Sequence, residues 1–238
     1  MKKIPILILH GWQVPVARYF SLKELFQKAG FQVLVPQLPG FAFKETIKKA
    51  YQLDDYLDFV VDFLKKKKID NIFLIGHSFG GRIAIKFAIL HPEKIRALIL
   101  TGVPAIREKK FKRQMFFVAA KIGKIFFAIP PFSFLQPVTR KLLYFLSDEW
   151  DYYQTKGKMR ETFQKIINEN LESLLTKIKA PTLLIWGEKD RIVPLSVAQE
   201  MVKRISGAKL TIIANASHKL PYEKPKIFSE KCLKFFIE

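Results

Sequence analysis

Residues 71–81 read Asn-Ile-Phe-Leu-Ile-Gly-His-Ser-Phe-Gly-Gly, and this stretch decides the fold. Its apolar first half predicts a buried strand, and the apolar periodicity that continues to Ala88 predicts a helix directly after it. Between them Ser78 occupies a tight turn, whose glycines let the helix pass close to the strand. Such a turn exposes the serine hydroxyl and leaves the Phe79 N–H at a helix N-terminus, where developing negative charge is stabilised. Ser78 is a candidate nucleophile; the alternative is a glycine-rich turn in another doubly wound protein.

Composition limits the class of protein. A chain of 238 residues that is 49% hydrophobic can bury a large core, and it suits one domain with an insertion. The single cysteine, Cys232, excludes an intramolecular disulfide and favours a reducing compartment. The apolar run Ile6–Leu9 is shorter than the core of a signal peptide, and no run is long enough for a membrane span. We therefore expect a cytoplasmic protein.

The net charge of +20 comes from 41 basic and 21 acidic residues. A field of this sign attracts anionic partners, among them an acidic carrier protein or an anionic membrane surface. The alternative is a lysine-rich composition whose charged side chains face solvent and bind no partner. No helix-turn-helix, zinc-finger or RNA-recognition pattern accompanies the charge, so we expect no nucleic-acid partner.

Apolar runs alternate with helical patterns along most of the chain, which is typical of a parallel sheet covered on both faces. We therefore predict an α/β fold with a mostly parallel sheet of about six strands and helices on both faces. A capping box of Ser21 and Glu24 is expected to begin the first helix, which ends at Gly30. The predicted strands are residues 4–9, 31–35, 71–75, 97–100, 182–186 and 210–213.

The alternation of apolar runs and helical patterns stops between residues 105 and 179. This stretch is aromatic, basic and helix-like, and it is broken by Pro130, Pro131 and Pro137. We predict an inserted helical cap, or lid, over 105–179, between core segments 1–104 and 180–238. Apolar side chains crowd residues 115–146, which predicts that the cap lines an apolar substrate cavity; packing of the cap on itself and on the core is the alternative.

A nucleophilic serine needs a histidine to accept its proton. Only His218 follows the last predicted strand, so it would emerge at the same carboxyl edge of the sheet as Ser78. The other candidates lie in the first loop, inside the turn and at the far end of the helix: they are His10, His77 and His91.

A carboxylate usually holds such a histidine in the right tautomer. Asp190 lies in the loop after the strand at 182–186 and therefore at the same edge; Glu188 is a weaker alternative. No cluster of His, Cys and Asp residues has the spacing of metal ligands, so we expect no metal and no organic cofactor.

Four motifs follow one another along nearly the whole chain. They are His10-Gly11-Trp12, the run Gly76–Gly81, Gly187-Glu188-Lys189-Asp190 and Ser217-His218. In this order they resemble the motifs of the α/β-hydrolase fold superfamily, in the lid-bearing branch of serine esterases and lipases related to the pimeloyl-acyl-carrier-protein methyl esterase.

The resemblance implies a serine hydrolase that cleaves carboxylic esters, or lactones, through an acyl-enzyme intermediate. It implies a triad of Ser78, Asp190 and His218, with the backbone N–H groups of Trp12 and Phe79 as the oxyanion hole. Two alternatives stay open. One is a hydrolase of carrier-protein-linked or lipid-like esters and thioesters that a basic cap recruits, and the other is a non-catalytic binding module on the same fold.

Overall fold

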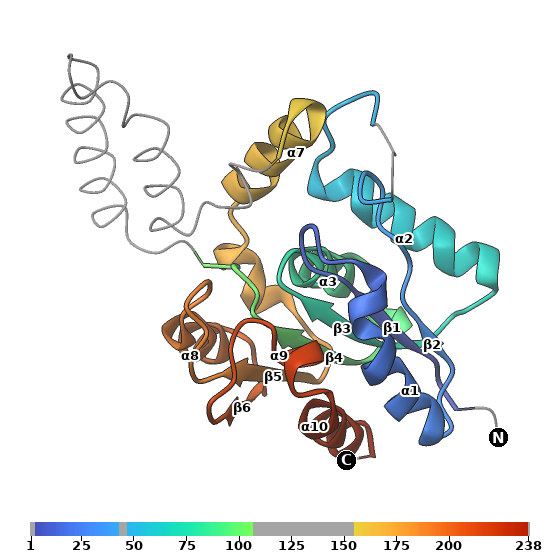
Figure 1. The fold of residues 1–238 in the computed structure, drawn as a ribbon, viewed down its shortest axis with the longest axis vertical. Helices are drawn as coiled ribbons and strands as arrows, with labels where there is room; N and C mark the ends of the chain where they lie inside the picture. Colours follow the sequence, from blue (N-terminus) through green and yellow to red (C-terminus); the bar gives the residue numbers. More distant parts are fainter. Residues whose placement is uncertain (1–2, 43–46, 107–154, 238) are drawn as a thin grey trace, which may run out of the picture.

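The computed structural model describes residues 3–42, 47–106 and 155–237. Within these ranges six strands form one parallel sheet in the order β2-β1-β3-β4-β5-β6 (Figure 1). This confirms the predicted α/β fold and its strand number. The strands are β1 (Ile6–Leu9), β2 (Val33–Leu34), β3 (Ile72–His77), β4 (Ile95–Thr101), β5 (Thr182–Gly187) and β6 (Lys209–Ile213).

Helices cover both faces of the sheet because successive side chains of each buried strand point to opposite sides. Leu7 and Leu9 of β1 belong to the core on one face, which also contains buried side chains of α2 (Leu53–Lys67), α3 (Phe79–Leu90) and α8 (Leu195–Arg204). Ile6 and Ile8 pack on the other face with α1 (Phe20–Lys28) and α10 (Pro225–Ile237). The short helix α9 (Leu220–Glu223) precedes α10.

The capping box predicted at Ser21 and Glu24 is wrong. A 3-10 turn, η1 (Val16–Tyr19), leads directly into α1, so Ser21 lies inside the first turn and makes no cap. A contact of the expected kind occurs at α2 instead, where Asp55 Oδ2 accepts a hydrogen bond of 2.8 Å from the Gln52 N–H.

The turn between β3 and α3 is strained as its sequence predicts. Ser78 has φ 52° and ψ −115°, a conformation that non-glycine residues rarely adopt. A Cβ atom at Gly80 would meet the backbone carbonyls of Leu9 and His10, so only glycine lets α3 approach the end of β1 this closely. The Gly80 N–H donates to the His10 carbonyl at 3.1 Å, which ties the turn to the loop after β1.

The predicted cap lies largely outside the described residues, including its apolar stretch 115–146. Its described end contains α7 (Gly157–Asn168) and the 3-10 helix η4 (Glu172–Lys177). Figure 1 shows α7 beside the segment that leads into α2, where the Tyr51 N–H donates to Thr162 Oγ1 at 2.9 Å. No helix among the described residues is long and apolar enough to cross a membrane.

Candidate active site

The candidate site residues lie in loops at the carboxyl ends of the strands. Ser78 follows β3, and its N–H donates to the carbonyl of Thr101, the last residue of β4, at 2.9 Å. Asp190 follows β5, and His218 follows β6. Parallel strands place all these ends at one edge of the sheet, which is where open α/β sheets carry their sites.

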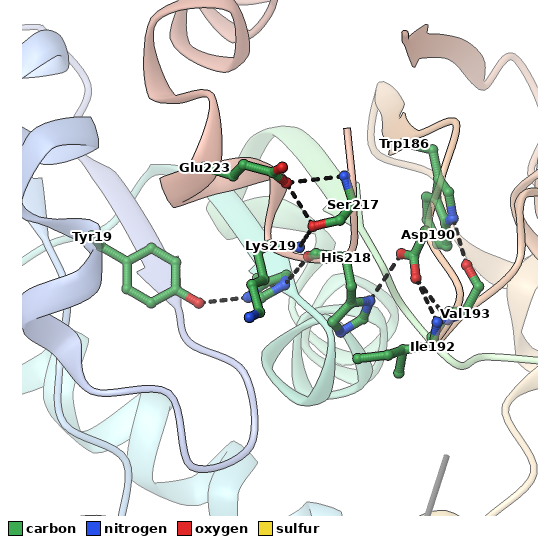
Figure 2. Close-up of polar contacts among 10 residues, drawn as sticks. Tyr19, Trp186, Asp190, Ile192, Val193, Ser217, His218, Lys219 and Glu223 are labelled. Carbon is green, nitrogen blue, oxygen red and sulfur yellow. Dashed lines mark hydrogen bonds and ion pairs between the residues drawn. The ribbon is translucent and has the colours of Figure 1, made fainter. Parts of the chain in front are cut away.

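His218 and Asp190 form a buried pair. His218 Nδ1 lies 2.9 Å from Asp190 Oδ2, and the two side chains are 11% and 2% exposed. The other carboxylate oxygen accepts the N–H groups of Ile192 at 3.0 Å and Val193 at 2.8 Å (Figure 2). Because an ionised carboxylate only accepts hydrogen bonds, His218 donates from Nδ1, and its Nε2 carries no proton in the neutral ring.

Ser78 and the His218–Asp190 pair each contact the end of β4. A Cβ atom at Gly102, the residue after β4, would lie 2.7 Å from His218 Cε1 and 3.4 Å from Asp190 Oδ2. The carbonyl of the preceding residue, Thr101, accepts a hydrogen bond from the Ser78 N–H. Among the described residues no hydrogen bond joins the Ser78 hydroxyl to His218, and in free enzymes this contact often tightens only with substrate.

Glu188, the weaker alternative, lies elsewhere. Its side chain is exposed and accepts the N–H of Asn215 at 3.0 Å. The structure therefore brings Asp190, and not Glu188, into contact with His218.

His10 orients the peptide group that carries the Trp12 N–H. Its Nε2 accepts the N–H of Leu38 at 3.0 Å, so its Nδ1 carries the proton and donates to the Gly11 carbonyl at 2.8 Å. Burial lowers the pKa of His10, which keeps the ring neutral. The Gly11 carbonyl and the Trp12 N–H belong to one planar trans peptide and point in opposite directions. His10 thus sets the direction of the Trp12 N–H, a role that the sequence analysis missed.

The Trp12 side chain belongs to an aromatic wall, which we define as Trp12, Phe41, Phe79 and Phe163. The Trp12 ring lies 4.8, 5.3 and 5.0 Å from the other three rings, respectively. Its Nε1–H donates to Thr155 Oγ1 at 3.3 Å, so the chain that leads into α7 rests on this residue. Trp12 therefore packs under the described end of the predicted cap while its backbone remains available as a donor.

Two contacts hold the loops that carry Asp190 and His218. Trp186 Nε1–H donates to the Val193 carbonyl at 2.9 Å, which closes the Asp190 loop. The Glu223 carboxylate accepts the Ser217 N–H at 3.0 Å and its hydroxyl at 2.6 Å (Figure 2). Sequence reasoning missed both because Trp186 lies in β5 and Glu223 in α9, and neither hydrogen bond follows a sequence period. Within the described ranges no group of three or more His, Cys, Asp or Glu side chains could hold a metal ion.

The comparisons with known proteins identify the family and the fold. The alpha/beta hydrolase fold family matches residues 4–225. A 2-hydroxy-6-oxo-6-phenylhexa-2,4-dienoate hydrolase of Comamonas testosteroni is 25% identical, over 97% of this chain and 86% of its own. A Mycoplasma genitalium protein that carries an esterase/lipase name is 27% identical, over 98% and 89%. The solved structure of an esterase from Exiguobacterium antarcticum superposes with a TM-score of 0.75 at 19% identity, covering 100% and 93% of the two chains.

Proposed function

Because this chain belongs to the α/β-hydrolase fold family, we propose that it is a serine hydrolase that cleaves carboxylic esters, with lactones as a related substrate class. Ser78 is the nucleophile, His218 the general base and acid, and Asp190 the carboxylate that orients His218. The Trp12 and Phe79 N–H groups form the oxyanion hole.

Acylation begins when the Ser78 oxygen attacks the ester carbonyl while its proton moves to His218 Nε2. Asp190 stabilises the imidazolium that forms, through the 2.9 Å bond to Nδ1. The negative charge that develops on the carbonyl oxygen is bound by the Trp12 and Phe79 N–H groups, and each such donor contributes about 3 kcal/mol to transition-state stabilisation.

Collapse of the tetrahedral intermediate breaks the ester C–O bond, and His218 Nε2–H protonates the departing alcohol. Water then attacks the acyl group on Ser78 and gives its proton to His218. The acid leaves, the Ser78 hydroxyl is restored, and no external oxidant or reductant is required.

One observation carries the proposal. The His218–Asp190 pair, with Nδ1 bound to the carboxylate, contacts Gly102 at the end of β4, and the preceding residue Thr101 accepts the N–H of Ser78 on its strained turn. This supports the proposal that His218 Nε2 accepts the proton of the Ser78 hydroxyl.

The test is hydrolysis of p-nitrophenyl esters by the wild-type protein and by Ser78→Ala, with a few lactones in the same panel. We expect Ser78→Ala to lower kcat by about 10⁴-fold or more with an unchanged circular dichroism spectrum. A wild-type protein that hydrolyses none of these substrates, or a fully active variant, would refute the assignment.

A second candidate reaction is hydrolysis of a carbon–carbon bond, favoured by the similarity to the Comamonas testosteroni dienoate hydrolase. The same Ser78, His218 and oxyanion donors would act on a ketone carbonyl, and a carbanion-equivalent enol would leave. Assay of that dienoate beside the esters distinguishes the two, because turnover of the dienoate alone would replace the ester proposal.

The net charge of +20 adds a proposal about partners. An acidic carrier protein or an anionic membrane would present the ester to this surface, and binding to either would weaken as salt rises. Sedimentation with anionic vesicles, or pulldown on an acidic carrier protein, at two salt concentrations tests this point.

A further inference from the structure

His77, the residue before Ser78, sits at the centre of a buried hydrogen-bond chain. It ends β3 and its side chain is fully buried. Its Nδ1 lies 2.6 Å from the Tyr19 hydroxyl, and its Nε2 lies 2.9 Å from the carbonyl oxygen of His218. The Tyr19 oxygen in turn accepts the N–H of Gly11 at 3.2 Å. One buried imidazole thus connects the loop after β1 to the loop after β6.

The chemistry of the partners determines the tautomer of His77. A backbone carbonyl only accepts hydrogen bonds, so Nε2 carries the proton and donates to His218. Nδ1 is then an acceptor, and the Tyr19 O–H donates to it. All donors point the same way, from the Gly11 N–H through Tyr19 and His77 to the His218 carbonyl. Figure 2 shows the Tyr19 hydroxyl on one side of His218 and Asp190 on the other.

We propose that His77, held by Tyr19 in its Nε2–H tautomer, is a positioning residue for hydrolysis that fixes the backbone of His218. This inference rests on the proposed role of His218 as the base. Asp190 binds the imidazole of His218, and His77 binds its backbone carbonyl. The two contacts therefore fix both the side chain and the main chain of His218. The site is buried at Tyr19 and His77, where water cannot readily replace a lost bond.

The same chain reaches the proposed oxyanion hole. Tyr19 binds the N–H of Gly11, and His10 binds the carbonyl of Gly11, so both ends of the residue before Trp12 are fixed. His77 and Tyr19 therefore fix the position of the His218 base relative to the Trp12 N–H. A displacement of about 1 Å between such groups can lower the reaction rate by about 100-fold.

Two substitutions at His77 separate its two bonds. His77→Asn keeps a polar atom near the Nδ1 position, toward Tyr19, but no longer reaches the His218 carbonyl. His77→Gln places an amide N–H near the Nε2 position and restores that donor. We expect kcat for a p-nitrophenyl ester to fall by about 10- to 100-fold in His77→Asn, with KM within about twofold, and to stay within about fivefold of wild type in His77→Gln. Unchanged kcat in His77→Asn, or equal losses in both variants that follow their melting temperatures, would overturn the proposal.

Tyr19→Phe removes only the hydroxyl that fixes the tautomer. We expect it to lower kcat by about tenfold and to mix the His77 tautomers in imidazole ¹⁵N spectra. The matched control is Thr182→Val, because Thr182 is a buried hydroxyl that donates to the Ala180 carbonyl at 2.8 Å at the opposite end of β5. The control should lower the melting temperature without changing kcat, and full activity in Tyr19→Phe would contradict the proposal.

The wild-type spectrum tests the proposal without any variant. Burial lowers the pKa of His77 to about 3, so its ring should show a neutral Nε2–H tautomer from pH 5 to pH 8. An Nδ1–H tautomer in that range would overturn the proposal. The outcomes also separate the two claims: full activity of Ser78→Ala refutes the nucleophile, whereas wild-type activity in His77→Asn refutes only the positioning role.

Discussion

The Asp190 carboxylate accepts three hydrogen bonds. Their division between its two oxygens determines the effect of replacing one oxygen by an amide nitrogen. Oδ1 binds the N–H groups of Ile192 and Val193, so Oδ2 is the atom that faces His218. The orientation of the carboxylate is thus set by the backbone of its own loop. At this scale the proposed chemistry depends on which nitrogen of His218 carries the proton.

Asp190→Asn should lower kcat for ester hydrolysis by about 10⁴-fold. The loop N–H groups would keep the amide oxygen at the Oδ1 position, so the amide NH₂ would face His218 and force its proton onto Nε2. The matched control is Glu188→Gln, an exposed acid two positions away that should leave kcat within about twofold. A severe loss in the control with a mild loss in Asp190→Asn would show that the wrong carboxylate has been chosen.

Buried neutral histidines should make the fold sensitive to mild acid. Burial lowers the pKa of His77 to about 3 against the ordinary value of 6.5, and burial also lowers the pKa of His10. The unfolded chain therefore binds protons that the folded chain does not, and stability falls as the pH drops below about 6.5 toward 3. From pH 7 to pH 5 His77 alone should cost about 2 kcal/mol.

Urea unfolding at the two pH values measures this loss. His77→Gln removes the titrating group, so its loss of stability between pH 7 and pH 5 should be smaller than that of the wild type by about 2 kcal/mol. An equal loss in both proteins would show that other groups cause the acid sensitivity.

At the scale of elements, α3 also connects two other segments of the chain through the side chain of Arg82. One helical turn after Ser78, the buried Arg82 guanidinium donates to the carbonyls of Pro104, Ile166 and Glu169. Pro104 directly precedes the predicted cap, Ile166 lies in the last turn of α7, and Glu169 directly follows α7. One side chain of α3 thus joins the residue just before the predicted cap to the described end of that cap.

Arg82→Met should lower the free energy of unfolding by about 2–4 kcal/mol, because three buried carbonyls would lose a charged donor. It should also raise KM more than it lowers kcat, since α7 packs on Trp12 through Phe163 and would shift. Arg204→Met is the control: Arg204 pairs with Glu172 and Glu200 at a half-exposed site, so its loss should cost under about 1 kcal/mol. Equal destabilisation by the two changes, as measured by urea unfolding, would contradict the role given to Arg82.

At the scale of the whole molecule, the aromatic wall joins four separate parts of the chain. Trp12 and Phe41 come from loops after β1 and β2, Phe79 from the start of α3, and Phe163 from α7. The rings lie beside the proposed oxyanion donors, so an apolar acyl chain would meet apolar surface there. The predicted apolar lining from residues 115–146 falls outside the described residues and stays a prediction.

Measuring kcat/KM for esters with acyl chains from C2 to C12 tests whether the site binds apolar acyl chains. We expect kcat/KM to rise by about fourfold for each of the first few methylenes, because each buried methylene contributes about 0.8 kcal/mol. Phe163→Ala should flatten that dependence more than it changes the rate with acetate. A maximum at acetate followed by a steady decline would show that the aromatic side chains fill the pocket themselves.

Sequence patterns alone correctly predicted the fold class, the strained turn at Ser78 and the place of His218 after the last strand, at the carboxyl edge of the sheet. These follow from local patterns: the period of apolar residues, the glycines around a serine, and the rule that parallel strands share one carboxyl edge. The start of α1 was mispredicted because the preceding 3-10 turn competes with a local capping signal.

Only the tertiary structure decided between Asp190 and Glu188, since both leave β5 in one short loop and their burial depends on packing against β6 and the His218 loop. It also shows the hydrogen bonds of His10, His77 and Tyr19. Each of these side chains bonds a backbone group contributed by another loop, at distances such as the 2.9 Å from His77 Nε2 to the His218 carbonyl. Such bonds have no sequence period, because they exist only once the loops have been brought together by the sheet.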